Sequence, residues 1–220
     1  MTKVGTHNQS IYEILKKYPS PYKIQRARLS SLLKINHLKT EKALLIYEKA
    51  KTTVGLPSNA LEFELLQTIQ LIELFKQTII DIDKEIKRLM STIESPIESI
   101  PGISTILGSI IIAEIKDIHN FRTPAQLLAF AGLEPSVRQS GLIENEGKML
   151  KRRSTHLRWA LIQAAKSVTR WSPTFNGYLS KKLAQGKHYN VAVSHVAKKL
   201  VRIIFHLLKN HKNFDESTLT

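Results

Sequence analysis

The stretch Ile100-Pro101-Gly102-Ile103-Ser104 lies near the start of the segment around which the chain is organised, residues 96–141. Proline fixes its own φ and glycine accepts a positive φ, so Pro101-Gly102 predicts a sharp reversal of the backbone. Ser95-Pro96 ends the preceding long helix. The sequence then predicts a short helix before the turn and an apolar helix of about 105–115 after it. The stretch therefore predicts two short helices joined by a tight turn.

This arrangement resembles the helix-hairpin-helix motif of DNA-binding proteins. The backbone N–H groups at the start of its second helix can hold a phosphate. The predicted DNA contacts of the turn are Gly102, Ile103, Ser104 and Thr105. Ser104 stands where such a motif usually has a second glycine, so we expect a looser approach of the phosphate.

Upstream of the turn, the sequence predicts one long helix over about 59–93. Its apolar positions are spaced by four and three: Leu61, Leu65, Thr68, Ile72, Phe75, Ile79, Ile82, Ile86, Leu89 and Ile93. An a/d seam of this kind favours a coiled coil and hence a homo-oligomer formed through residues 58–95. An intramolecular hairpin with the preceding helices is the alternative.

The predicted fold class is all-α, because strand patterns are weak throughout. We expect the N-terminal helices of an arm over 1–57 and a coiled-coil helix over 58–95. A compact helical domain with the helix-hairpin-helix follows over 96–209, with a disordered tail over 210–220. Within the compact domain, residues 133–153 are predicted to form a loop that can hold a short hairpin.

The composition favours a polyanionic partner. The formal net charge is +15 and the isoelectric point is about 10.0, which makes nucleic acid the leading candidate and a solvated basic face the alternative. The chain has no Cys and no apolar stretch long enough to span a bilayer. We expect a cytoplasmic, nucleoid-associated protein without membrane contact.

The polar loop after Gly132 is a candidate nucleophile loop. Attack of a serine hydroxyl on a phosphodiester needs removal of its proton and nearby cations to stabilise the charge that develops. Ser140 precedes Gly141, and Ser136 is nearly as good a candidate. The predicted DNA-contacting cations around this loop are Arg138, Lys148, Lys151, Arg152, Arg153 and Arg158.

A second basic group lies nearer the C-terminus and consists of Lys181, Lys182, Lys187, Lys198, Lys199 and Arg202. Such clusters contact phosphates without reading base sequence. The histidines lack the spacing of a metal site, so we predict no metal in this chain.

Five stretches in order resemble an insertion-sequence transposase of the family of Piv-type DNA invertases and bridge-RNA-guided recombinases. They are residues 100–104, 121–133, Ser140-Gly141, Lys151-Arg152 with Leu157-Arg158, and Ala192 with residues 197–200. The resemblance covers the C-terminal two thirds of such a protein. It implies that Ser140 forms a phosphoserine link to DNA, and that a structured guide RNA can be a partner.

The same resemblance implies an N-terminal RuvC-like nuclease domain with acidic ligands for Mg²⁺. No Asp precedes Asp81, and Asp81 and Asp83 lie on the predicted long helix, so we expect that this domain is missing. Mg²⁺ is then expected only with such a domain, and this chain alone is expected not to complete recombination. Arg153 also departs from the family, which usually has glycine there.

Two hypotheses follow. In the first, the chain is a DNA-binding transposase or site-specific recombinase part with Ser140 as its nucleophile. In the second, it is a non-enzymatic, oligomerising nucleic-acid-binding remnant or regulator. Whether the chain is an enzyme is left open by its sequence.

Overall fold

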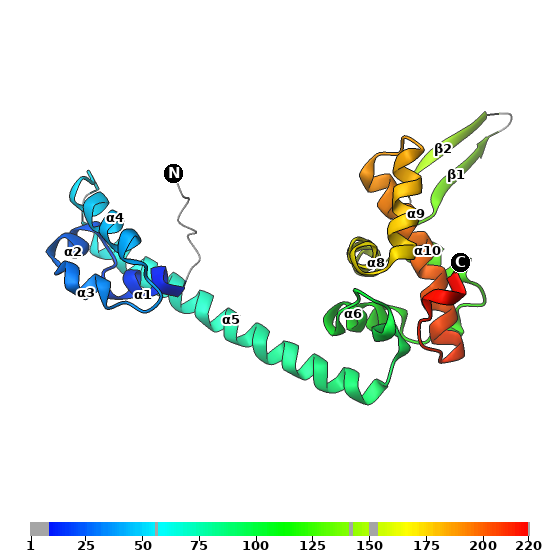
Figure 1. The fold of residues 1–220 in the computed structure, drawn as a ribbon, viewed down its shortest axis with the longest axis horizontal. Coiled ribbons are helices and arrows are strands. Elements are labelled where there is room, and N and C mark those ends of the chain that lie inside the picture. The colour runs from blue at the N-terminus through cyan, green and yellow to red at the C-terminus, as the bar shows by residue number, and fades with distance from the viewer. Residues whose placement is uncertain (1–8, 56, 141–142, 150–153, 220) are drawn as a thin grey trace. The chain divides into compact units, whose positions relative to one another are not determined.

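The computed structural model describes residues 9–55, 57–140, 143–149 and 154–219. Helices form nearly all of its regular structure, so the predicted all-α class is confirmed; one β-hairpin is added to them (Figure 1). The chain divides into two compact units, Met1–Asp81 and Ile82–Thr220. The division falls inside the long helix α5, Asn59–Ile93, and not at either of its ends.

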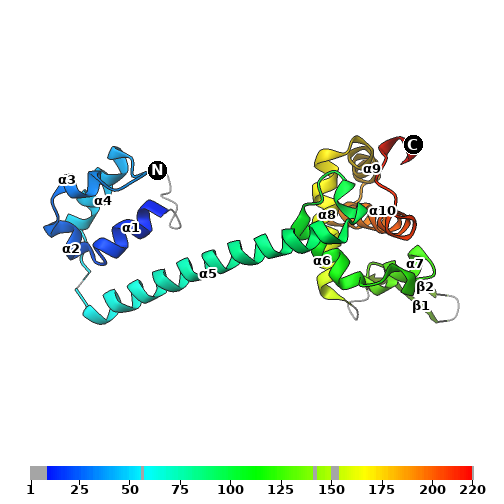
Figure 2. The same ribbon diagram turned by 90° about the horizontal axis from the view of Figure 1, so that it is seen from below.

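The first unit gathers four short helices beside the N-terminal part of α5 (Figure 2). Its core is made of Ile14, Ile24, Leu32, Ala43 and Ala50. Ion pairs at its surface join Lys23 to Glu62 at 2.6 Å and Lys16 to Glu73 at 2.5 Å. The bounds of the four helices are α1 Gln9–Lys17, α2 Pro21–Arg26, α3 Leu29–Leu33 and α4 Thr40–Lys51.

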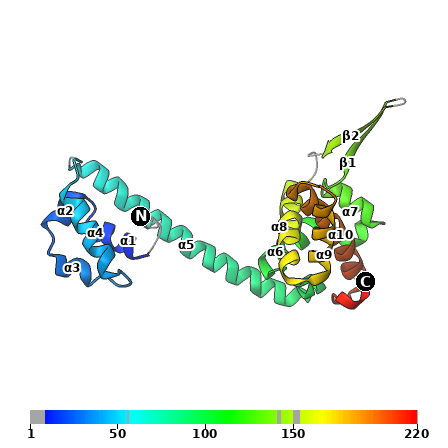
Figure 3. The same cartoon turned by 45° about the horizontal axis from the view of Figure 1, so that its top comes forward.

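The second unit is built around helix α8, Thr155–Trp171. Small residues Ala160, Ala164 and Ala165 are fully buried on α8, which lets the neighbouring helices approach closely. Helix α8 packs against α6, α9 and α10 (Figure 3). The helices of this unit are α6 Thr105–Ile115, α7 Pro124–Phe130, α8, α9 Pro173–Ala184 and α10 Tyr189–Asn210, with 3-10 turns η1 Pro96–Ser99, η2 Ile118–Asn120 and η3 Glu216–Leu219.

Strands β1, Pro135–Ser140, and β2, Ile143–Met149, form an antiparallel hairpin inside the predicted loop. The register pairs Ser140 with Ile143 and Pro135 with Met149, and an irregularity between Pro135 and Val137 shifts it. The hairpin projects from the helices of its unit (Figure 1). The backbone of Ser140 is therefore the last paired position of β1.

The C-terminal segment packs on the helices, whereas the sequence predicts a disordered tail over 210–220. Phe214 stacks on Phe175 with their ring centroids 6.4 Å apart, and its N–H donates to Ser99 Oγ at 2.7 Å. Glu216 Oε1 accepts hydrogen bonds from Ser172 Oγ and from the Thr174 N–H at the start of α9. These two donors hold the pKa of Glu216 below its ordinary value. Two aromatic rings and a carboxylate at a helix start are enough to fix this segment.

Candidate nucleic-acid interface

The predicted turn at Gly102 forms, and it lies against α8. Gly102 has φ +90°, as a sharp reversal requires, and a Cβ added there would lie 3.0 Å from the backbone of Ser167 and 2.8 Å from Trp171 Cδ1. The side chain of Ile103 is buried, and its N–H donates to the Ile100 carbonyl. Gly102 and Ile103 thus have packing roles that are sufficient to explain them.

Ser104 and Thr105 lie at the start of α6. Ser104 is the N-cap, because its Oγ accepts from the Leu107 N–H at 3.3 Å. Its carbonyl accepts from the Gly108 N–H at 2.8 Å. The element before the turn is the single 3-10 turn η1, which is shorter than the first helix of the predicted motif.

Arg158 contacts the end of α7 on the protein side. Its Nε donates to the carbonyls of Ala131 and Gly132, each at 3.2 Å. These carbonyls follow α7, where the helix leaves acceptors unpaired. Arg158 therefore has a structural role in addition to the predicted DNA contact.

The candidate nucleophile lies on the hairpin, and the register separates it from one of its predicted cations. Arg138 pairs with Asn145, two residues before Ser140, so these two positions share the distal half of β1. Lys148 lies near the opposite end of the hairpin, next to Met149 in β2. Five residues of strand separate it from Ile143, the partner of Ser140, which is a distance of about 17 Å along the strand. Lys151, Arg152 and Arg153 lie outside the described residues.

The two predicted parts of the site lie at opposite ends of α8. Near its start, Ser154 caps the helix and donates through Oγ to Glu114 at the end of α6, at 2.6 Å. Near its end, Ser167 and Trp171 meet the turn at Gly102. Helices α6 and α8 are thus antiparallel, and from Arg158 to Ser167 is about 14 Å of helix. The predicted turn therefore lies near the end of α8, and the Arg158 contact lies near its start.

All of the formal net charge of +15 lies in residues 147–214. This segment contains fifteen of the 33 Lys and Arg residues and none of the 18 Asp and Glu residues, and the rest of the chain is balanced. Lys166 and Arg170 on α8 belong to it, although the sequence analysis did not single them out. The absence of Asp and Glu from residues 147–214 is the sequence feature that would have identified Lys166 and Arg170.

Three lysines of the second basic group act on His195 of α10. Partial burial lowers the pKa of His195 below its ordinary value of 6.5, and the charges of Lys198, Lys187 and Lys182 lower it further. Lys182 and Lys199 lie over the Tyr178 ring, with Nζ at 5.4 and 5.2 Å from its centroid. The pairing of α9 with α10 therefore brings together cations that are up to seventeen residues apart in sequence, between Lys182 and Lys199.

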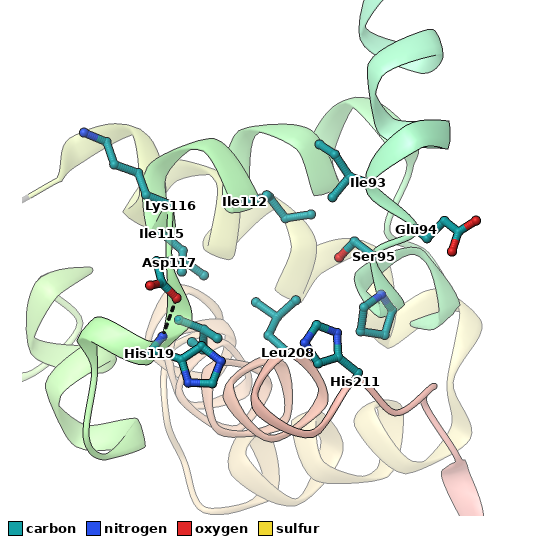
Figure 4. Close-up of a pocket in the computed structure, with 12 residues that line it drawn as sticks. Ile93, Glu94, Ser95, Ile112, Ile115, Lys116, Asp117, His119, Leu208 and His211 are labelled. Carbon is teal, nitrogen blue, oxygen red and sulfur yellow. Dashed lines mark hydrogen bonds between the residues drawn. The ribbon is translucent and has the colours of Figure 1, made fainter.

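A pocket of about 290 Å³ lies at the ends of α5, α6 and α10 (Figure 4). Its wall is apolar at Ile112 and Leu208, and Asp117 accepts from the His119 N–H at 2.8 Å beside it. None of the predicted site residues lines this pocket. The candidate interface therefore lies outside this pocket.

Residues 94–180 match the model of the transposase family IS116/IS110/IS902. This segment contains η1, the turn at Gly102, α6, α7, the hairpin and α8. The transposase resemblance is thus supported at the level of this family. The Piv-type and RNA-guided subtype stays a prediction.

Curated relatives are named for insertion elements and transposases. A protein of insertion element IS116 from Streptomyces clavuligerus is 26% identical over 211 residues, which are 91% of this chain and 53% of that protein. A probable family 20 transposase from Pseudomonas aeruginosa is 32% identical, over 57% of this chain and 36% of its own length. The transposase of element IS1111A from Coxiella burnetii is 30% identical, over 61% and 38%. The chain spans about half the length of the first relative and less of the other two.

No helix in the described part of the chain combines the length and apolar character needed to cross a membrane. Within the same residues, no three His, Asp or Glu side chains come together as a metal site would require.

Proposed function

We propose that the chain is a DNA-binding part of an insertion-element transposase and acts in DNA transposition. The observation that carries the proposal is the family match of residues 94–180, which include the turn, the hairpin and α8. The concentration of the whole net charge in residues 147–214 supports it, because clustered cations bind the phosphate backbone.

We further propose that Ser140 is the nucleophile. Its Oγ would form a bond to the phosphorus of a DNA phosphodiester as the bond from phosphorus to one sugar oxygen breaks. The serine proton goes to a base, and the leaving sugar oxygen takes up a proton. The phosphoserine link retains the energy of the phosphodiester, so a later attack by a sugar hydroxyl can rejoin strands. The position of the Ser140 backbone supports this role. Ser140 is the last paired residue of β1, and the hairpin projects from the helices of its unit, so a DNA backbone could reach it.

A denaturing-gel assay for a covalent protein–DNA adduct tests the role of Ser140. Element-end DNA and magnesium are supplied, with and without a separate RuvC-like domain. The expected result is an adduct that is lost in Ser140→Ala and retained in Ser136→Ala, which changes the other candidate serine of the same strand. Loss in Ser136→Ala alone would assign the nucleophile to Ser136. Salt-sensitive DNA binding with no adduct would support the non-enzymatic binding protein instead.

We also propose that the chain forms a homo-oligomer through α5 and that a structured RNA is a second ligand of the basic segment, residues 147–214. Support for the oligomer comes from the seam residues Phe75, Ile79 and Ile82, whose side chains are between 52% and 63% exposed. An apolar stripe of this size is unfavourable in water, and a second copy of the helix would cover it.

A further inference from the structure

Helix α8 exposes both tryptophans of the chain. Trp159 is 55% and Trp171 is 69% exposed, and the sequence contains no other Trp. The opposite side of α8 is buried at Leu157, Leu161 and Val168. Tryptophan is highly buried on average, so two exposed indoles on one helix are unusual for a surface with no ligand.

Cations lie between the two indoles. Trp159, Gln163, Lys166 and Arg170 follow at spacings of four, three and four, which places them along one face of α8. Trp171 follows Arg170 directly and lies about a third of a turn round from Trp159. The two tryptophans are about 18 Å apart along the helix axis. This aromatic and basic face, which we call the α8 face, lies within the segment that contains no Asp or Glu.

We propose that the α8 face binds an unpaired nucleic-acid strand, with bases stacked on Trp159 and Trp171 and phosphates held by Lys166 and Arg170. This inference rests on the proposed function and specifies the form of its nucleic-acid ligand. An indole offers a flat apolar surface and one N–H donor, which suits the exposed face of a base. In a duplex those faces are covered by neighbouring base pairs, so a duplex can engage the cations and not the indoles.

The contact of Trp171 with the turn distinguishes the two indoles. Trp171 lies against Gly102, so part of its role is to pack the turn. Trp159 is not among the residues against the Gly102 turn, so a substitution of Trp159 tests nucleic-acid binding without disturbing that packing. Through Trp171, the α8 face is in contact with the predicted helix-hairpin-helix turn.

Tryptophan emission tests the inference directly, since it reports on the α8 face alone. The full chain is titrated with a single-stranded DNA oligonucleotide, the matching duplex and a single-stranded RNA of the same sequence. We expect strong quenching by the single strands and little by the duplex. Trp159→Phe and Trp171→Phe each leave one reporter, and both reporters should be quenched. The DNA and RNA arms show which strand is preferred.

The affinity of Trp159→Ala provides the second measurement, with anisotropy of a labelled single strand as the readout. Loss of one stacked base should weaken binding about fivefold or more. Phe63→Ala, which removes an aromatic side chain of 66% exposure from α5, is the matched control and should leave affinity unchanged. Thermal melting checks that both variants fold.

Three outcomes would overturn the inference. Binding of the duplex and single strands with unquenched tryptophan would reject the α8 face and leave the proposed function intact. A change in emission with protein concentration alone would assign the face to a second protein surface. Absence of any nucleic-acid binding would reject the proposed function together with the inference.

Discussion

At the scale of single residues, Gly102 lets the turn before α6 pack closely against α8. Its φ of +90° is accessible to glycine at no steric cost, and the space where a Cβ would stand is occupied by Ser167 and Trp171. The same residue type therefore satisfies a conformational and a packing requirement. A phosphate-binding role is not needed to explain its presence.

Gly102→Ala is expected to lower the free energy of unfolding by about 1–3 kcal/mol, because it adds backbone strain to a contact at 3.0 Å with the backbone of Ser167. Denaturant unfolding followed by circular dichroism measures the change. Gly177→Ala is the matched control: nothing lies within 4 Å of its added Cβ, and it is inside α9. There the helix propensity of alanine should stabilise by about 0.5–1 kcal/mol. Equal effects of the two substitutions would contradict this explanation.

At the scale of elements, α5 contributes to the core of each unit and leaves its middle uncovered. Ile69 and Met90 are buried, whereas every residue from 74 to 82 is exposed in the single chain. A helix with apolar residues on an uncovered stripe gains free energy by pairing. Ile86, by contrast, packs against the core of the second unit, so a charge there would also damage that core.

Phe75→Asp together with Ile79→Asp should convert the proposed oligomer into a monomer, because association would bury two unpaired charges. Light scattering after size-exclusion chromatography gives the mass. Gln67→Asp together with Gln70→Asp adds the same charge to exposed positions of α5 outside the seam and should leave the mass unchanged. An unaltered mass of the seam variant, or a monomeric parent chain, would argue against pairing through α5.

Local chemistry in the sequence was sufficient to place the starts of several helices. Ser20, Thr123 and Ser172 each precede a Pro, a pattern that predicts a helix start, and the Oγ of each accepts from the backbone N–H three residues on. Gln126 occupies the third helical position after the Thr123 cap, where a capping box would have it bind the Thr123 N–H. Its Oε1 instead accepts from the N–H of Arg122, one residue earlier, at 2.7 Å. Signals of this kind act within one turn, so they can be read from sequence alone.

Contacts between distant elements could not be predicted in this way. The bond of Ser154 to Glu114 spans 40 residues, and that of Ser172 to Glu216 spans 44. Neither carboxylate is marked by any local pattern. Glu216 and Phe214 are the two residues that hold the tail beside Phe175 and the start of α9. For the candidate site, the residue types were predicted, but the separation of the turn from the hairpin base by α8 required the fold.

At the scale of the whole molecule, one segment carries all of the net positive charge and the rest of the chain is balanced. Residues 147–214 carry the net charge of +15, and the burial of α8 and α10 in one core brings its cations to the surface of one unit. Self-repulsion within such a segment costs stability, which phosphate binding would relieve. His195 senses this field, since the charges of Lys198, Lys187 and Lys182 add to burial in lowering its pKa.

Replacing Lys182, Lys187 and Lys198 by Ala should change two quantities together. The first is the slope of log affinity for duplex DNA against log salt concentration. Its magnitude should fall by about 2 to 3, since each lost phosphate contact lowers it by ~0.9. The control replaces Lys42, Lys49 and Lys51 of the first unit by Ala, which changes the charge by the same amount and should leave the slope of this plot unchanged.

By NMR titration, the pKa of His195 in the variant without Lys182, Lys187 and Lys198 should rise toward 6.5. In the parent chain the folded state binds this proton at lower pH than the unfolded state does, so its contribution to stability is lost as pH falls below 6.5. The variant should lose less stability over that interval. A shallower slope with an unchanged pKa would mean that the lysines contact DNA but do not set the field at His195, and an unchanged slope would place the DNA contacts elsewhere in the segment.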